Sequence, residues 1–211
     1  MKIYKFLENP FWYRLIIRLF SVISSPAYIR SEANFLEKMF SQEGKGVLLE
    51  VGCGTCKFNG LYEKHVPQYF ATDINFDYLK YAKKMTKNAV FTVSDSQLLP
   101  FRPYSFDSIF ALFMFHHLPD ESVQATLQQL DLCLKDEGKL VVMDVFLPDN
   151  YFNLPALIAG KIDRGRHVRK RSHFLNFCTR KKIFKWQEID FKESWPYDVS
   201  AFILHKSRTH E

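Results

Sequence analysis

The stretch LLEVGCGTCKFNG (residues 48–60) contains two patterns that could carry chemistry. Gly52 and Gly54 permit a tight turn at which the backbone can approach a nucleotide-like cofactor. Cys53 and Cys56 form a CxxC pair, as found in thiol redox domains or in half of a zinc site. Either pattern suits a loop between a strand and a helix, so the rest of the chain must distinguish them.

Carboxylates stand at the ends of the next two apolar runs. Asp73 lies 19 residues after Gly54, a spacing at which an acid can accept hydrogen bonds from both ribose hydroxyls. Asp95, followed by Ser96, can accept a hydrogen bond from an exocyclic amine such as that of adenine. Because ligands of open parallel sheets bind at the carboxyl ends of the strands, these acids are expected to line one crevice with the glycine loop. A thiol redox domain has no need of them, so the pattern favours an adenosine-like ligand.

The cysteines give little support to a metal site. No second CxxC and no paired histidine cluster completes a zinc site, so we expect no metal. Cys133 and Cys178 look like ordinary small apolar residues, and four cysteines in 211 residues indicate a reducing compartment and not a disulfide scaffold.

The elements that would position these residues alternate along the chain. The strand-like runs are short, apolar and rich in β-branched or aromatic residues; they cover residues 46–52, 68–73, 89–95, 106–113, 138–146, 186–193 and 198–206. Helical patterns cover residues 75–85 and 121–134, and Gly138 is expected to cap the second helix.

This alternation predicts an α/β fold, namely a Rossmann-like, doubly wound, seven-stranded and mostly parallel sheet. The last two strands are joined by the short segment SWPY, which cannot span a parallel crossover, so they should form an antiparallel edge hairpin. We expect N-terminal helices over residues 1–45 and one domain over residues 46–211, with a basic insertion at 147–185.

From residue 46 to about residue 146 the sequence resembles class I S-adenosylmethionine-dependent methyltransferases of the small-molecule and lipid type (methyltransferase type 11-like). The matching segments follow in the family's order and spacing: LLEVGCGTC, ATDIN, SDSQLLPF, SFDSIFALFMFHHLPD and LCLKDEGKLVVMDVF. A glycine loop alone would be a weak match, whereas its combination with the later segments is specific. The chain departs from the family at Cys56, where a third glycine or another small residue is usual, and at LKDEG, where LKPGG is usual.

The resemblance implies S-adenosylmethionine as the cofactor and assigns roles by position. The residues implied to contact it are Glu50, Gly52, Cys53 and Gly54 at the methionine end, Asp73 at the ribose, Ile74 on the adenine face, Asp95 and Ser96 at the adenine edge, and Ala111 beneath the methyl group.

A general base is needed only if the methyl acceptor must lose a proton. His116 and His117 follow the fourth strand near the methyl site and are the candidates, although in this family the pair often shapes the turn instead. Asp144 and Asp149, after the fifth strand, are weaker candidates for the acceptor pocket.

A nicotinamide dinucleotide site would also combine a glycine loop with a ribose acid. Its loop reads G-x-G-x-x-G and its helix N-terminus faces a pyrophosphate, but here the sixth position is Lys57. Glu50 lies two residues before the first glycine. A carboxylate there would repel a pyrophosphate and suits an amino-acid tail and a sulfonium, which favours the methyl donor.

The net charge of +6 is unevenly spread. Residues 161–185 carry ten Lys or Arg against Asp163 alone, a net +9, so the remaining residues sum to −3. Such a run suits an anionic partner such as phospholipid head groups, a phosphorylated substrate or nucleic acid, or else forms a solvated face.

Acceptor specificity should come from segments outside the resemblance, about residues 10–43 and 147–185. Their aromatic and basic residues suit a small-molecule or lipid-like acceptor, such as a quinone precursor or a phospholipid head group, and peripheral contact with an anionic membrane. Alternatively, both segments only cover the sheet. Glu8, Arg14 and Arg18 interrupt the N-terminal apolar stretch, so we expect neither a transmembrane span nor a signal peptide, and a cytoplasmic protein that is membrane-peripheral if this contact forms.

Two other functional classes stay open. One is a nucleic-acid or protein methyltransferase, but ALFMFHH lacks the N/D-P-P-Y/F pattern of amino-directed nucleic-acid enzymes. The other is a non-catalytic nucleotide-binding module, which the intact Asp73 and Asp95 disfavour. The oligomeric state does not follow from the sequence.

Overall fold

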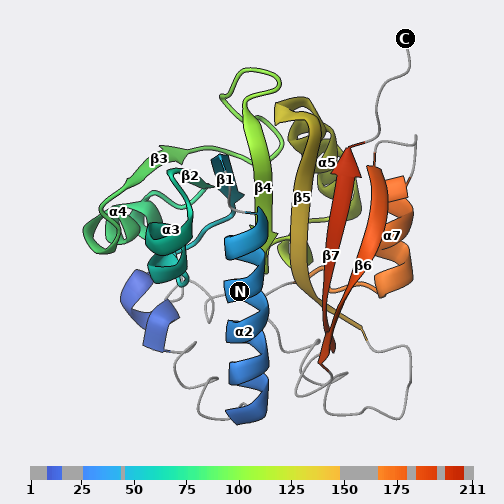
Figure 1. Cartoon of the computed structure of the whole chain (residues 1–211), viewed down its shortest axis with the longest axis horizontal. Helices are drawn as coiled ribbons and strands as arrows, with labels where there is room; N and C mark the ends of the chain where they lie inside the picture. Colours follow the sequence, from blue (N-terminus) through green and yellow to red (C-terminus); the bar gives the residue numbers. More distant parts are fainter. Residues whose placement is uncertain are drawn as a thin grey trace.

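The computed structural model describes residues 9–15, 26–43, 46–147, 166–179, 184–193 and 198–206. Within them, one 7-stranded sheet has the order β3-β2-β1-β4-β5-β7-β6 (Figure 1). The strands are β1 (Val47–Val51), β2 (Gln68–Asp73), β3 (Ala89–Val93), β4 (Phe106–Leu112), β5 (Leu134–Phe146), β6 (Phe184–Glu193) and β7 (Asp198–Lys206). The helices are α2 (Pro26–Glu43), α3 (Asn59–His65), α4 (Phe76–Met85), the 3-10 helix η2 (Phe115–His117), α5 (Asp120–Cys133), α7 (Arg171–Thr179) and a short helix over residues 10–15, called the 10–15 helix below.

The sheet combines parallel and antiparallel pairings. Strands β1 to β5 pair in parallel, whereas β7 pairs antiparallel with both β5 and β6. This confirms the predicted α/β fold with an antiparallel pair at one edge. The last strand of the chain, β7, lies between β5 and β6, so β6 forms the edge.

Buried apolar side chains form two clusters, one on each face of the sheet. Because successive residues of a strand point to opposite faces, Leu48 packs with residues of α2, α3 and α4, and Leu49 with residues of α5 and α7. Figure 1 shows α2 in front of the sheet and α5 and α7 behind it. Both faces are therefore covered, as a doubly wound sheet requires.

The predicted helix cap at Gly138 is wrong. Helix α5 ends at Cys133 and β5 begins at once, and the register against β4 shifts between the pairs Phe106–Leu134 and Ser108–Lys139. The extra residues form a bulge within β5, in which Glu137 has a φ of 64°. Gly138 is needed for space, because an ideal Cβ there would lie 2.8 Å from the carbonyl oxygen of Lys135.

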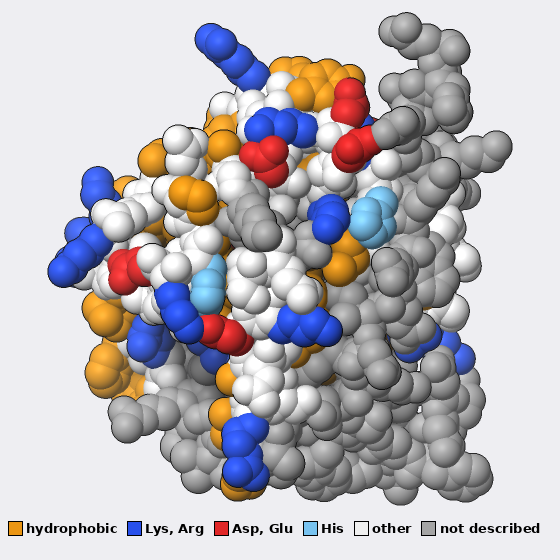
Figure 2. Space-filling model, viewed as in Figure 1, with side chains coloured by type: hydrophobic (Ala, Val, Ile, Leu, Met, Phe, Trp, Pro, Cys, Tyr) orange, Lys and Arg blue, Asp and Glu red, His pale blue; other side chains and the backbone are white. Residues whose placement is uncertain are grey.

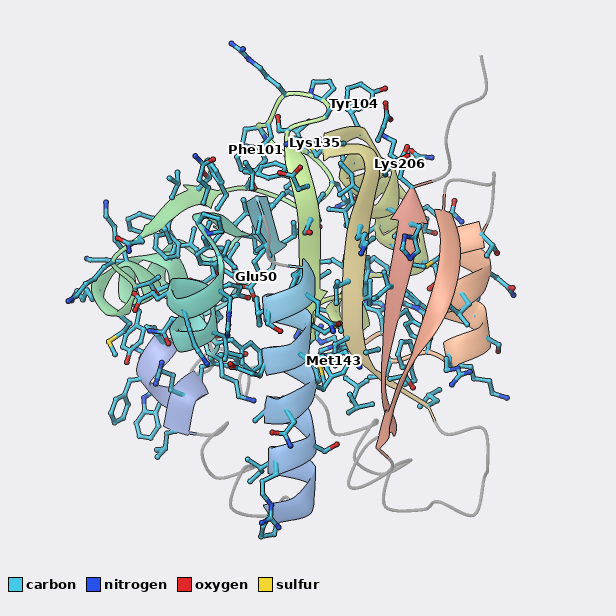
Figure 3. The ribbon with its side chains drawn as sticks, in the orientation of Figure 1. Glu50, Phe101, Tyr104, Lys135, Met143 and Lys206 are labelled. Carbon is cyan, nitrogen blue, oxygen red and sulfur yellow. The ribbon has the colours of Figure 1, made fainter. Side chains whose placement is uncertain are left out.

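The carboxyl ends of the parallel strands share one edge of the sheet, the lower edge in Figure 1. Figure 3 shows Glu50 and Met143 toward this edge, with Tyr104, Lys135 and Lys206 at the opposite one. Among the helices that the structure describes, none combines the length and the apolarity needed to cross a membrane.

Candidate functional site

The glycine loop after β1 is tied to the end of β2. The backbone N–H groups of Gly52 and Cys53 both donate to the carbonyl oxygen of Thr72, at 2.8 and 3.0 Å. Gly52 has a φ of 70° and Gly54 a φ of 55°, in the left-handed region that favours glycine. An ideal Cβ on Gly52 would lie 2.6 Å from Cγ of Met114, so the loop also packs closely against the turn after β4.

Asp73 contacts this loop directly, as its spacing from Gly54 predicts. Its Oδ2 accepts a hydrogen bond from the backbone N–H of Gly54 at 2.8 Å, and its Oδ1 accepts one from Asn75 at 2.8 Å. The next residue, Ile74, is an apolar side chain that is 71% exposed.

The segment that follows β3 lies next to Asp73 as well. The backbone N–H of Ser94 donates to the carbonyl oxygen of Asp73 at 3.2 Å, and Asp95 accepts from the backbone N–H of Gln97 at 2.9 Å. The Ser96 hydroxyl is hydrogen-bonded to that of Thr126 on α5, at 2.9 Å. Leu98, which our sequence analysis did not single out, is 77% exposed.

Glu50, two residues before Gly52, carries a buried carboxyl group. Burial, with a smaller contribution from the charge of Asp73, raises its pKa from 4.5 to about 7. The Tyr69 hydroxyl opposes this shift, because it donates a hydrogen bond to Oε2 at 2.5 Å. A cation bound at the loop would favour the ionised form of this carboxyl. The site is therefore better suited to a sulfonium or an ammonium group than to a phosphate.

The CxxC cysteines are buried free thiols. Burial raises the pKa of the Cys53 thiol well above its ordinary value, which makes the thiolate scarce and the residue a poor nucleophile. Cys56 has a φ of 52°, the conformation of a glycine, at the position where the resemblance expects a third glycine. In the described part of the chain no cluster of His, Cys, Asp and Glu could hold a metal ion.

Of the residues implied at the methyl site, Ala111 is buried within β4, and its side chain packs in the cluster beneath α5. Only its backbone remains for a ligand, as the resemblance implies. The chain then turns sharply, because Phe113 has a φ of 55° and its backbone N–H donates to the carbonyl oxygen of Met143 at 2.7 Å.

The turn after β4 presents a buried histidine–aspartate pair. Nδ1 of His116 lies 2.5 Å from Oδ1 of Asp144, at the end of β5, and the backbone N–H of His116 donates to Oδ2 at 3.1 Å. Both side chains are buried, whereas His117 is exposed, with its ring centroid 4.0 Å from that of His116. The structure therefore separates two candidates that the sequence could not rank. Asp149 lies outside the described residues.

The side chain of Arg169 binds the backbone of this turn. It donates through Nη1 to the carbonyl oxygen of Phe115 at 2.9 Å and through Nη2 to that of Leu118 at 2.5 Å. It is only 7% exposed, so this member of the basic run is neither a solvated charge nor a surface contact for a partner. Its role depends on long-range contacts, which the local sequence does not show.

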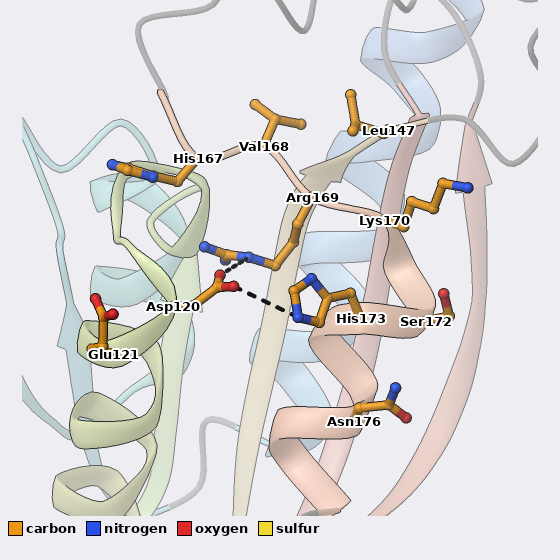
Figure 4. A pocket seen from close by; sticks show the side chains of 10 residues that line it. All are labelled: Asp120, Glu121, Leu147, His167, Val168, Arg169, Lys170, Ser172, His173 and Asn176. Atoms are coloured by element: carbon orange, nitrogen blue, oxygen red, sulfur yellow. Dashed lines mark ion pairs between the residues drawn. The ribbon is translucent and has the colours of Figure 1, made fainter.

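A pocket of about 820 Å³ opens beside the turn (Figure 4). Its lining residues come from the start of α5, the residue after β5, the segment entering α7, and α7 itself: Asp120, Glu121, Leu147, His167, Val168, Arg169, Lys170, Ser172, His173 and Asn176. Asp120 lies 3.3 Å from Nε of Arg169 and 3.6 Å from Nε2 of His173. The backbone N–H of His167 donates to the carbonyl oxygen of His116, which joins the pocket to the histidine–aspartate pair.

Comparison with known proteins relates the chain to methyltransferases. Residues 49–142 match a family model described as a methyltransferase domain. An uncharacterized methyltransferase of Bacillus velezensis is 28% identical over 163 residues, which cover 75% of this chain and 76% of the relative. These matches support a class I S-adenosylmethionine-dependent methyltransferase, with the methyltransferase domain at residues 49–142.

Solved structures share the fold of this methyltransferase. A Pyrococcus horikoshii protein superimposes with a TM-score of 0.69 at 21% identity, covering 88% of this chain and 93% of that one. A TehB-like SAM-dependent methyltransferase from Corynebacterium glutamicum superimposes with a TM-score of 0.66 at 15% identity, covering 94% and 98%.

The residues of the methyltransferase at this edge fit its cofactor, S-adenosylmethionine. Gly54 leaves space beside the loop, since an ideal Cβ there meets only Tyr13 among the described residues, at 3.8 Å. The exposed apolar side chains of Ile74 and Leu98 suit a flat base, and Asp73 suits the ribose hydroxyls. The buried carboxyl of Glu50 suits the positive charges of the methionine end.

Proposed function

We propose that this methyltransferase acts on a small-molecule or lipid-like acceptor that loses a proton on methylation, with His116 as the general base. The observation that carries the proposal is the 2.5 Å contact between Nδ1 of His116 and Oδ1 of Asp144. A carboxylate at Nδ1 holds the proton on that nitrogen and makes Nε2 the basic atom of the neutral ring. This is the arrangement by which an aspartate orients a catalytic histidine.

When bound, S-adenosylmethionine supplies an activated methyl group, whose transfer breaks the carbon–sulfur bond and leaves a neutral thioether. The protein has to align the acceptor with the methyl carbon and exclude water. In our proposal His116 Nε2 takes the proton that the acceptor atom loses. Asp144, which also accepts from the backbone N–H of Val145 at 2.7 Å, then balances the charge of the imidazolium.

The pocket beside η2 supports a polar acceptor group. It mixes cationic, acidic and imidazole side chains, and only Leu147 and Val168 among its lining residues are apolar. Such a lining suits a head group more than an acyl chain, which would lie outside it. A lipid-like acceptor of this kind would be reached at a membrane surface.

A peripheral membrane contact is the second part of the proposal. Phe11 is 65% exposed and Trp12 46% exposed on the 10–15 helix. Figure 2 shows hydrophobic side chains at the left margin of the molecule, where α4 and this helix lie in Figure 1. Aromatic side chains flanked by a basic residue such as Arg14 favour the membrane interface.

Methyl transfer from radiolabelled S-adenosylmethionine to a panel of quinone precursors, phospholipids and small phenols tests the activity. With an acceptor found, His116→Gln and Asp144→Asn should lower kcat by about 100- to 10,000-fold, as for loss of a general base. The affinity for S-adenosylhomocysteine should change little, because neither side chain belongs to the glycine loop.

The matched control is His205→Gln on β7, remote in sequence from the turn and paired opposite Lys139 and Lys185. It should keep the kcat of the wild type. Unchanged kcat in His116→Gln would refute the general base. Failure of the wild type to bind S-adenosylhomocysteine would remove the whole proposal.

A further inference from the structure

The 10–15 helix is held in place by the rest of the protein. Asn9 caps it, since its Oδ1 accepts a hydrogen bond from the backbone N–H of Phe11 at 2.9 Å. Isolated helices of this length are marginal in water, so contacts outside the helix must fix its position.

Those contacts are made with α4. The Tyr13 ring stacks on the Tyr78 ring with centroids 5.0 Å apart and an interplanar angle of 28°. The Arg14 guanidinium lies over the Tyr81 ring, 5.1 Å from its centroid. Helix α4 starts just after Asp73, so the 10–15 helix is attached beside the predicted ribose site.

Tyr13 also reaches the glycine loop. An ideal Cβ on Gly54 would lie 3.8 Å from the Tyr13 hydroxyl oxygen and 3.9 Å from its Cε1. Apart from the two neighbouring residues of the chain, no other described atom lies within 4 Å of that position. The backbone N–H of the same glycine donates to Asp73, so Tyr13 and the predicted ribose acid both adjoin Gly54. The tyrosine therefore spans the two segments, loop and α4, between which the cofactor would lie.

We infer that Tyr13 is a residue of the cofactor site, whose hydroxyl donates a hydrogen bond to the carboxylate of the methionine end of S-adenosylmethionine. The inference rests on the cofactor assignment and on the methionine end lying at the glycine loop. The aromatic stack on Tyr78 orients the ring, so the hydroxyl is presented without loss of side-chain freedom on binding. None of the family segments within residues 46–146 contains this residue.

Calorimetric titration with S-adenosylhomocysteine and with adenosine tests it. Tyr13→Phe keeps the ring and removes the hydroxyl, and should weaken S-adenosylhomocysteine binding by about 3- to 10-fold. Adenosine lacks the amino-acid tail, so its affinity should stay within about twofold of the wild type. Tyr13→Ala should weaken S-adenosylhomocysteine binding by about tenfold or more, since the ring is lost too.

Tyr104→Phe is the matched control, because Tyr104 is an exposed tyrosine at the opposite edge of the sheet (Figure 3). It should bind both ligands as the wild type does. Unchanged or tighter S-adenosylhomocysteine binding by Tyr13→Phe would overturn the inference, and so would an equal loss for both ligands, which would mean a general effect on the loop. No binding by the wild type would instead refute the cofactor assignment itself.

Discussion

At the scale of single residues, the buried carboxyl of Glu50 makes the stability of the protein depend on pH. Its carboxyl is buried and holds its proton to about pH 7 in the folded protein, while an unfolded glutamate loses its proton near pH 4.5. Between these values the folded state binds more protons than the unfolded state, so the wild type loses stability as the pH rises. A cationic ligand would recover part of this loss by stabilising the ionised carboxyl.

Glu50→Gln should therefore be more stable than the wild type at neutral and higher pH. The difference between a pKa of 4.5 and one of about 7 corresponds to about 3 kcal/mol at pH 8. The gain should be near zero at pH 4, grow up to pH 7 and then stay constant, as measured by urea unfolding across the pH range. A pH-independent difference between Glu50→Gln and the wild type would contradict the argument.

At the scale of elements, β5 shows how a bulge can replace a turn. Nζ of Lys135, in the bulge, donates to both carboxylate oxygens of Asp107 on β4 at 2.8 Å, and Nζ of Lys206 donates to the carbonyl oxygen of Leu134 at 2.9 Å. These bonds fix the segment between α5 and the part of β5 that pairs regularly from Lys139 onward. The end of β5 then places Asp144 opposite the turn that carries His116.

Two glycine substitutions should change the free energy of unfolding in opposite directions. Gly138→Ala would place a Cβ 2.7 Å from Cγ of Leu134 and 2.8 Å from a backbone oxygen, so it should cost about 1–3 kcal/mol of unfolding free energy. Gly60→Ala on α3 meets nothing within 4 Å and should stabilise by about 0.5–1 kcal/mol through helix propensity. Urea unfolding of both variants measures the difference, and a loss at Gly60 equal to that at Gly138 would show that close approach is not the cause.

At the scale of the whole molecule, the site residues and the exposed aromatic residues of the 10–15 helix are close in space. Tyr13 faces the glycine loop, while its neighbours Phe11 and Trp12 are exposed. In our proposal one short helix would thus connect the cofactor site to a membrane surface. The formal net charge of +6 would favour anionic lipid over neutral lipid.

Liposome flotation tests this arrangement. The wild type should float with anionic vesicles at low salt and be released at high salt, because a surface attraction between charges is screened. The double variant Phe11→Ala, Trp12→Ala should float several-fold less. Leu132→Ala removes an exposed apolar side chain on α5 and should behave as the wild type. A wild type that stays in solution at low salt would remove the membrane proposal.

Much of the fold follows from local patterns. Short apolar runs predicted the strands to within a few residues, and the brevity of SWPY predicted the antiparallel pair, because both depend on neighbouring residues only. Gly138 shows the limit of this reasoning. A glycine after a helix is usually a cap, and only the register of β5 against β4 reveals the bulge.

The sequence by itself determined the order of strands and helices, the glycine loop, and which strand ends carry acids, since alternation and spacing are local properties. Only the tertiary structure decided which groups meet. The pairing of His116 with Asp144, the burial of Arg169 beneath the turn, and the position of Tyr13 over Gly54 all join distant segments. Their energies come from contacts and desolvation across the folded chain, which no local pattern of residues records.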